Sequence, residues 1–274
     1  ISKAVSQAAA HYKRFEKVRP NDMWQADFKG HFQMQNGERC YPLNILDDCS
    51  RFCLCSDALR NETLGEVKPV FQRLFREYGL PFSLLCDNGN PWGTSQSMGY
   101  TAFEVWLMEL GVLTIHGRPL HPQTQGKDER YNRSFTRECL NVNSFLDIAD
   151  AQLKFDAYRS FYNNIRPHCA LDLNVPSAVF QKSEHPFPEK VIDWEYGPEY
   201  QRCKVSETGY FSYGGHRYFL SEGFRGKSIA VRESALPGQI TLVFRQFRIG
   251  RIDLDKRVYT LKKCYLLDND PRLD

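Results

Sequence analysis

A helix between two strands, in residues 63–87, restricts the fold of this chain more than any other segment. Six apolar residues recur at helical spacing, and a glycine and a proline follow them and stop the helix. Thr63 and Glu66 have the spacing of a capping box at its start. The short apolar run 82–86 comes next and is typical of a buried strand. Because a crossover helix joins strands that run in parallel, the sequence predicts an α/β fold with parallel pairing.

The strands that precede this helix are expected to form an antiparallel meander. Apolar and polar residues alternate through residues 23–32, which predicts a strand with one packed face. Asn36 and Gly37 are a hairpin signal, and further strands are expected at 41–45 and 52–58. Capping residues and apolar periodicity predict three later helices, which cover residues 101–110, a segment that begins near Gly126, and residues 148–165. The expected architecture is a mixed sheet flanked by helices.

The pattern changes after a linker that contains prolines. Short alternating strands separated by glycine turns fill the C-terminal part and predict a small all-β barrel. Residues 201–264 hold 13 Lys and Arg against 5 Asp and Glu, a net charge of +8, which leaves −5 for the rest of a chain whose net charge is +3. A compact module with this excess fits a polyphosphate partner. The predicted domains are a basic helical lead (1–20), an α/β core (21–185), a linker (186–200) and a basic β-barrel (201–266).

Several classes of protein do not fit this sequence. It has no apolar run long enough to span a membrane and no signal peptide, so we expect a cytoplasmic protein without a membrane partner. The nine cysteines lack paired Cys-x-x-Cys motifs, which favours reduced thiols over a zinc site or disulfides. No Gly-x4-Gly-Lys-Ser/Thr loop for a nucleotide is present. The chain begins at Ile1, so we expect a fragment with a segment missing upstream.

Three carboxylates occupy positions from which they could meet. Asp27 lies within the first strand, Asp87 ends the strand after the crossover helix, and Glu129 lies on the first turn of the helix near Gly126. If the first and fourth strands are neighbours, all three reach one point, because reacting groups collect past the carboxyl ends of parallel strands. Converging carboxylates repel one another unless divalent cations hold them. Oxygen-only ligation suits Mg²⁺ or Mn²⁺, and a pair of ions about 3.5–4 Å apart supports phosphoryl displacement.

The segments around these acids carry a family resemblance. Trp24-x-x-Asp27, Cys86-Asp87-Asn88-Gly89 and residues 121–130 resemble the catalytic core of DDE-type insertion-sequence transposases, which are related to retroviral integrases. Residues 24–30, 89–93 and 162–171 also resemble segments of those transposases, and the likeness covers roughly 21–185. It implies an RNase H-like core with Asp27, Asp87 and Glu129 as the catalytic and metal-binding triad for two Mg²⁺ or Mn²⁺ ions. The interval from Asp87 to Glu129 is longer than is usual for integrases, and the loop at 90–99 would absorb the excess.

Basic and polar residues near the acids are candidates for DNA contact. Gln125 and Asn132 resemble the polar positions that flank the acid in integrases. Trp92 has two interpretations, a core residue or a stacking platform for an unpaired base. The candidates in the core are Lys29, Trp92, His121, Gln125, Lys127, Arg130, Asn132, Arg133 and Arg137. The candidates in the barrel are Arg217, Arg225, Lys227, Arg245, Arg248 and Arg251, with Tyr210, Phe219 and Phe244 as its expected core.

Other acidic and histidine side chains receive a structural interpretation. Asp128 adjoins Glu129 but points 100° away around the helix, so we expect it at the surface. Asp47 and Asp48 belong to a turn, where Asp is common. Glu104 is expected to cap the helix at 101–110 rather than bind metal. His116 is interpreted as a loop residue, with DNA contact as the alternative.

The resemblance implies a DNA transposase that cleaves DNA at the 3′ ends of its element and joins those ends to a target. Its partners would be transposon terminal inverted repeats and target DNA, and it would act as a homodimer or higher oligomer, nucleoid-associated in a bacterial cytoplasm. One alternative is an RNase H-like nuclease that hydrolyses DNA and never joins it. A second is a domesticated transposase that only binds DNA, against which the complete set of three acids argues.

Overall fold

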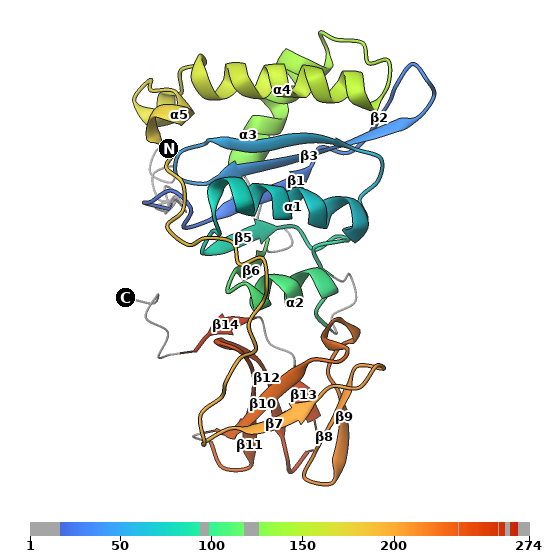
Figure 1. The fold of residues 1–274 in the computed structure, drawn as a ribbon, viewed down its shortest axis with the longest axis vertical. Helices are drawn as coiled ribbons and strands as arrows, with labels where there is room; N and C mark the ends of the chain where they lie inside the picture. Colours follow the sequence, from blue (N-terminus) through green and yellow to red (C-terminus); the bar gives the residue numbers. More distant parts are fainter. Residues whose placement is uncertain are drawn as a thin grey trace, which may run out of the picture.

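The computed structural model of the 274-residue chain describes residues 17–93, 99–117, 126–234, 236–256, 258–260 and 264–267. Its two main sheets lie at opposite ends of the molecule, with helix α2 (Ala102–Glu109) between them (Figure 1). Residues 1–16 of the expected basic lead, part of the loop at 90–99, and the candidates His121 and Gln125 lie outside the described residues.

The N-terminal sheet is mixed, as predicted. Its strands are β1 (Trp24–Phe28), β2 (Phe32–Gln33), β3 (Arg39–Asp47), β4 (Cys53–Leu59), β5 (Ser83–Cys86) and β6 (Leu113–His116). They follow the order β2-β3-β1-β5-β6, with β4 paired to β3. β1 is antiparallel to β3 and parallel to β5, and β6 is parallel to β5. The first and fourth predicted strands are therefore neighbours.

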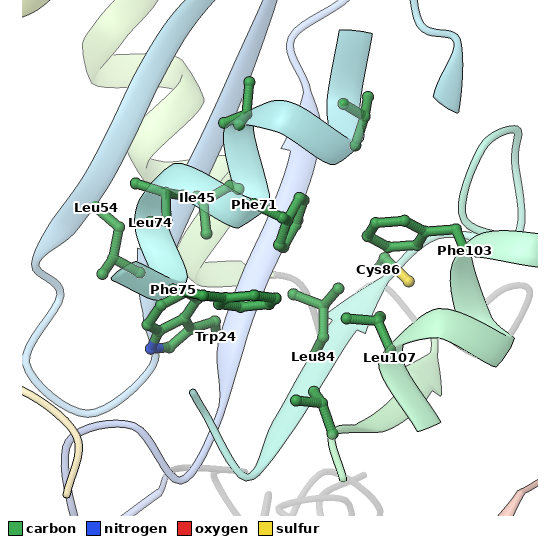
Figure 2. Close-up of a cluster of buried hydrophobic side chains, with 14 of the residues drawn as sticks. Trp24, Ile45, Leu54, Phe71, Leu74, Phe75, Leu84, Cys86, Phe103 and Leu107 are labelled. Carbon is green, nitrogen blue, oxygen red and sulfur yellow. The ribbon is translucent and has the colours of Figure 1, made fainter. Parts of the chain in front are cut away.

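Helices cover both faces of this sheet (Figure 1). They are α1 (Leu64–Tyr78), α2, α3 (Gly126–Phe135), which continues as a π-helix (Thr136–Leu140), α4 (Ile148–Asn164) and α5 (Pro176–Val179), with a short 3₁₀ turn at Cys169–Leu171. The apolar stripe of α1 packs on Trp24, Ile45 and Leu54, as Figure 2 shows. Tyr131 and Phe135 of α3 pack with α4 against the opposite face, as the helical spacing predicted.

The two predicted capping boxes have different outcomes. The box at Thr101 and Glu104 is present with both reciprocal hydrogen bonds. The box at Thr63 and Glu66 is wrong, because Thr63 makes no side-chain bond to its helix and donates its hydroxyl to Asn61 instead. In a capping box the hydroxyl would accept from an amide of the helix, whereas here it donates to a side chain that precedes the helix.

Side chains of α4 occupy the free edge of β4. Asn163 donates to the Cys53 carbonyl and accepts from the Cys53 amide, both at 2.9 Å. Gln152 accepts from the Ala58 amide and donates to a carbonyl of the same strand, and Arg159 donates to the carbonyl of Leu54. These contacts satisfy backbone groups that would otherwise be exposed at the sheet edge.

The C-terminal strands form an open sheet instead of the predicted closed barrel. The strands are β7 (Gln201–Lys204), β8 (Tyr210–Tyr213), β9 (His216–Phe219), β10 (Ser228–Glu233), β11 (Gln239–Phe244), β12 (Phe247–Asp253), β13 (Val258–Thr260) and β14 (Tyr265–Leu266), with a 3₁₀ turn at Glu222–Phe224 before β10. The sheet runs β13-β12-β11-β10-β7 with β14 beside β12, while β8 and β9 pair only with each other among the described strands. No described strand therefore joins the two ends of the larger sheet.

The core of the C-terminal sheet differs in part from the expected one. Phe244 is buried as predicted. Phe211 and Tyr218 are the buried aromatics of the β8–β9 hairpin, whereas Tyr210 and Phe219 pack on each other and are only partly buried. Because side chains alternate across a strand, an error of one residue exchanges the two faces.

Helix α2 belongs to both cores. Phe103 and Leu107 pack with the N-terminal sheet, whereas Val105 and Met108 pack with the C-terminal sheet. The buried hydroxyl of Ser221 accepts from the amide of Tyr100 at 3.0 Å and donates to its carbonyl at 2.6 Å. A helix that is apolar on all sides is typical of such a buried position.

All nine cysteines are free thiols, in agreement with the absence of disulfides predicted above. Within the described residues, none of the helices combines the length and the apolar character that a membrane crossing requires.

Candidate active site

Asp27 and Glu129 line the same open cavity of about 620 Å³. Asp27 lies near the end of β1, and Glu129 is exposed on the first turn of α3. The complete lining consists of Asp27, Phe28, Lys29, Glu129, Asn132, Arg133, Thr136, Arg137 and Asn141. The cavity thus places two of the predicted acids beside three predicted DNA-binding cations: Lys29, Arg133 and Arg137.

A chain of side-chain amides fixes α3 over Asp27. Asn44 lies opposite Asp27 in the β1–β3 ladder and donates to Oδ1 of Asn132 at 2.7 Å. The amide group of Asn132 in turn donates to Oδ2 of Asp27 at 2.7 Å. Because Asn44 occupies the oxygen of Asn132, the nitrogen of Asn132 must face the carboxylate. Asn132 is 7% exposed and holds Asp27, and its role in DNA contact stays a prediction.

A second polar contact continues this row across the sheet. Ser56 of β4 lies opposite Asn44, and its hydroxyl is 2.6 Å from the hydroxyl of Tyr131 on α3. Asp27, Asn44 and Ser56 therefore share the face beneath α3. Their contacts with Tyr131 and Asn132 fix α3, which carries Glu129 three residues before Asn132.

The environment of Asp27 favours the protonated carboxyl group. Burial raises its pKa from 3.8 to about 6, and the negative charge of Asp87 adds to the increase. The hydrogen bond from Asn132 and the charge of Lys29 act in the opposite direction. Two carboxylates that interact in this way form a site that is short of positive charge.

Asp87 is held at the turn immediately after β5. Its carboxylate is exposed and accepts from the amide of Gly89 at 2.8 Å. Its backbone carbonyl lies 2.8 Å from Nδ1 of His116, whose Nε2 lies 2.8 Å from Oε1 of Glu104. His116 is thus the last residue of β6 and contacts Asp87, in contrast to the loop position expected for it.

Glu104 controls the ionisation of His116. Burial alone would lower the pKa of His116, but the hydrogen bond and the charge of Glu104 outweigh burial and raise it. Both ring nitrogens face acceptors, which a protonated imidazole satisfies together. Sequence patterns did not pair these residues, because the contact joins the start of α2 to the end of β6.

The prediction that Asp128 lies at the surface is wrong. It is 2% exposed, and neither carboxylate oxygen has a hydrogen-bond partner among the described residues. Burial, followed by the charges of Asp27 and Asp48, raises its pKa well above 3.8. Its helix lies on the β3–β4 turn, where Lys127 forms a 2.7 Å ion pair with the buried Asp48. Lys127, a predicted DNA-binding residue, is therefore paired with a carboxylate of the protein itself.

The oxygen donors around the cavity fit a hard divalent cation. Asp27 keeps one oxygen free of the Asn132 contact, and the exposed carboxylate of Glu129 faces the same cavity. Such oxygens are the ligands that Mg²⁺ and Mn²⁺ prefer. Within the described residues, no three His, Cys, Asp or Glu side chains lie close enough together to hold an ion.

Trp92 is a core residue, which excludes the base-stacking alternative in this structure. Its side chain is 1% exposed and packs on Phe28, Phe71 and Phe103. No face of the indole remains for a nucleotide base.

The other basic candidates do not share one surface. Arg130 is exposed, does not line the cavity, and its charge contributes to a low pKa of His168. Arg217 lies over Tyr210 on the separate hairpin, and Arg225 pairs with Glu222. The remaining contacts bind the C-terminal sheet to its surroundings: Lys227 to Glu109 at 2.5 Å and Arg245 to the carbonyl of Ile192 at 2.7 Å.

Arg248 and Arg251 belong to a basic face that sequence analysis described only in part. In the cross-strand pairing, Arg251 lies opposite Thr241, which lies opposite Arg232. Arg248, Val243, Ala230 and Arg202 form a second row on the same face, two residues away along β10 and β11. The four arginines therefore project from the same face of the C-terminal sheet, because directly paired residues share a face.

Comparison with known proteins places these features in a family. Residues 17–122 and 110–176 match two models of the integrase core domain, and residues 201–260 match the C-terminal domain of IS481 family transposases. The chain is 29% identical over 178 residues to an uncharacterised 39.2 kDa protein of insertion element IS476 from Xanthomonas euvesicatoria, which covers 65% of this chain and 49% of that protein. It is 30% identical over 165 residues to an uncharacterised 31.7 kDa protein of insertion element IS407 from Burkholderia multivorans, which covers 60% of this chain and 56% of that protein.

A solved structure is also similar. One chain in the cryoEM structure of a simian T-cell lymphotropic virus intasome in complex with the PP2A regulatory subunit B56 gamma matches with a TM-score of 0.49 and 16% identity, covering 84% of this chain and 78% of that one. The chain spans about half the length of the curated relatives it matches. The two integrase core matches together span residues 17–176, which is more than half of the chain. The chain therefore belongs to the integrase core family and carries the C-terminal domain of an IS481 family transposase.

Proposed function

We propose that this chain is the catalytic part of a DNA transposase that cleaves DNA at the ends of its element and joins the 3′-hydroxyl ends to target DNA. The observation that carries the proposal is the cavity in which Asp27 and Glu129 meet Lys29, Arg133 and Arg137. Acids and cations around one cavity suit a phosphodiester, because the acids hold divalent ions and the cations hold phosphate oxygens. The match to the integrase core supports the same chemistry.

Asp27, Asp87 and Glu129 are the residues that would hold two Mg²⁺ or Mn²⁺ ions. When bound, such ions activate the attacking oxygen and stabilise the leaving 3′-oxygen of an in-line displacement. The amide group of Asn132 donates to Oδ2 of Asp27 at 2.7 Å and would orient this carboxylate at the cavity that it lines. Lys29, Arg133 and Arg137 line the same space and would hold the phosphates on either side of the scissile bond.

Joining of DNA ends distinguishes this function from its rivals. Labelled duplexes from the two ends of the element that encodes the chain are incubated with supercoiled plasmid in Mg²⁺ or Mn²⁺. We expect nicked ends and plasmid that has gained the label. Cleavage without labelled plasmid would indicate a nuclease, and metal-independent binding without cleavage would indicate a DNA-binding protein.

The variant Asp87→Asn tests the assignment of the acids. We expect it to abolish cleavage and joining while DNA binding stays largely intact, because an amide cannot replace an ionised ligand. Asn88→Ala is a matched control at the next position, whose side chain contacts the Gly117 carbonyl. Normal cleavage by folded Asp87→Asn would show that the assignment is incorrect.

A further inference from the structure

The imidazole of His116 bridges Asp87 and Glu104 on the side of the site away from α3. Nδ1 contacts the backbone carbonyl of Asp87 and Nε2 contacts Oε1 of Glu104, each at 2.8 Å. The side chains of His116 and Glu104 are 22% and 7% exposed. The ring cannot turn without losing both contacts.

The contact between His116 and the Asp87 carbonyl lies just past the end of the β5–β6 ladder. The ladder between β5 and β6 stops at the pair Cys86 and His116. Asp87 is the next residue, and the side chain of His116 holds the carbonyl that the ladder no longer holds. The ring of His116 therefore holds the backbone of Asp87 from one side, while the amide of Gly89 holds its carboxylate from the other.

Glu104 is itself fixed from the opposite side. Its Oε2 accepts from the amide of Thr101 at 2.6 Å, while its Oε1 contacts His116. The two oxygens thus connect the first turn of α2 to the end of β6. Helix α2 is anchored to the C-terminal sheet by the contacts of Tyr100 with Ser221 and of Glu109 with Lys227.

We propose that Glu104 and His116 are positioning residues that orient Asp87 for phosphoryl transfer. This inference rests on the proposed function and adds two residues to it that act through Asp87. Side chains that orient a ligand from behind typically change metal affinity or activity by about 10–100-fold when they are removed.

The variant Glu104→Gln tests whether His116 needs the hydrogen bond of residue 104 or its negative charge. The side-chain oxygen of glutamine can accept from the Thr101 amide, and its nitrogen can donate to Nε2 of a neutral His116, which leaves Nδ1–H for the Asp87 carbonyl. We therefore expect Glu104→Gln to remain close to the unchanged protein. Glu104→Ala loses both contacts, and His116→Ala loses the contact with Asp87 directly.

The experiment compares these three variants with the unchanged 274-residue chain in three measurements. They are Mn²⁺ affinity from the electron paramagnetic resonance signal of free Mn²⁺, DNA affinity without metal from fluorescence anisotropy, and the rate of metal-dependent cleavage. We expect Glu104→Ala and His116→Ala to lower Mn²⁺ affinity and the cleavage rate by about 10-fold or more, with DNA affinity nearly unchanged. Thr101→Ala is the control for helix capping, because it removes the cap but keeps the amide that binds Glu104; it should lower the melting temperature and leave the rate unchanged.

Three results would overturn the inference. One is unchanged Mn²⁺ affinity and cleavage in His116→Ala, which would show that the ring does not act on Asp87. Another is a loss in Glu104→Gln as large as that in Glu104→Ala, which would make the carboxylate a ligand or a required charge. The third is a loss of cleavage rate in the Ala variants that is fully explained by a smaller folded fraction. In that case Thr101→Ala, which also lowers stability, would lose activity in the same way. Absence of metal-dependent cleavage in the unchanged chain would instead overturn the proposed function.

Discussion

The two sides of the candidate site are supported in different ways. Asp27 is held by Asn132 and Asn44, which come from α3 and β3 and are 7% and 0% exposed. Asp87 lies on an exposed turn and is held through His116 and Glu104. The first side is complete within the N-terminal sheet and its own helix. The second depends on α2, which is shared with the C-terminal sheet.

This difference indicates a division of tasks in the fold. A buried amide chain gives the Asp27 side a single arrangement, because Asn132 has one partner for its oxygen and another for its nitrogen. On the Asp87 side, the contacts pass through a helix that the C-terminal sheet also holds. A change at the C-terminal sheet should therefore reach Asp87 before it reaches Asp27.

The largest expected effect is on the Asp27 side. Asn132→Ala removes the donor that orients Asp27 and leaves Asn44 without an acceptor, so metal-dependent cleavage should fall by about 100-fold. Thr136→Ala is the matched control, because Thr136 lines the same cavity and its hydroxyl donates to the backbone carbonyl of Asn132. Equal cleavage rates for Asn132→Ala and the unchanged chain would show that Asn132 does not orient Asp27 for cleavage.

Asp128→Asn should stabilise the same side at neutral pH. Burial raises the pKa of Asp128 well above 3.8, so above that pH the folded protein binds a proton at this carboxyl more tightly than the unfolded chain does. Below pH 3.8 the carboxyl is protonated in both states and the asparagine has no advantage. As pH rises above 3.8 the cost grows, and near pH 7 we expect a gain of about 2 kcal/mol in the free energy of unfolding.

Urea denaturation without metal at pH 4 and pH 7 measures this gain. Asp150→Asn is the control, since the pKa of Asp150 is lowered by Lys154 and its substitution should not stabilise the protein. A gain for Asp128→Asn that is the same at both pH values would contradict the assigned ionisation.

Ser221→Ala tests the connection of α2 to the C-terminal sheet. It removes two hydrogen bonds to the backbone of Tyr100 and should cost about 1–2 kcal/mol of stability. Hydrogen exchange should increase at residues 86–89 and 116–117 more than in α3, because only the former depend on α2. Ser206→Ala, which removes a contact within the C-terminal region, is the control. Equal increases on both sides would contradict the comparison.

The smallest effect is expected for Lys227→Met. Its ion pair with Glu109 is partly exposed, with side-chain exposures of 38% and 15%, so its loss should cost less than about 1 kcal/mol. Because this lysine is paired with α2, its removal should weaken DNA binding less than Arg251→Ala does. Anisotropy titrations at two salt concentrations compare the DNA affinities of the two variants. A larger loss of affinity in Lys227→Met than in Arg251→Ala would indicate that Lys227 contacts DNA.

Local patterns were sufficient for much of the fold. The strand–helix–strand order predicted parallel pairing, and β5 is indeed parallel to its neighbours β1 and β6. Helical spacing predicted that Tyr131 and Phe135 face the core while Glu129 faces away. These features depend on periodicity within one element or on the direction of a single connection. The roles of Asp27, Asp87 and Glu129 stay predictions.

Contacts between distant segments could not be predicted in this way. Asp128 is buried because α3 lies on the turn that contains Asp48, 80 residues earlier in the sequence. The contacts of His116 and Asn132 likewise join elements whose register a single sequence does not define. The open C-terminal sheet has the same cause, since closure depends on which strands pair and not on how many are present.

The contacts between α4 and β4 have a consequence for shortened forms of the chain. In the full chain, amide and guanidinium groups of α4 act as a substitute for a further strand, and the sheet cannot extend past β4. A product that ends before Ile148 would present those backbone groups uncovered, ready to pair with the same edge of another copy. Helix α4 therefore prevents two copies from pairing edge to edge through β4.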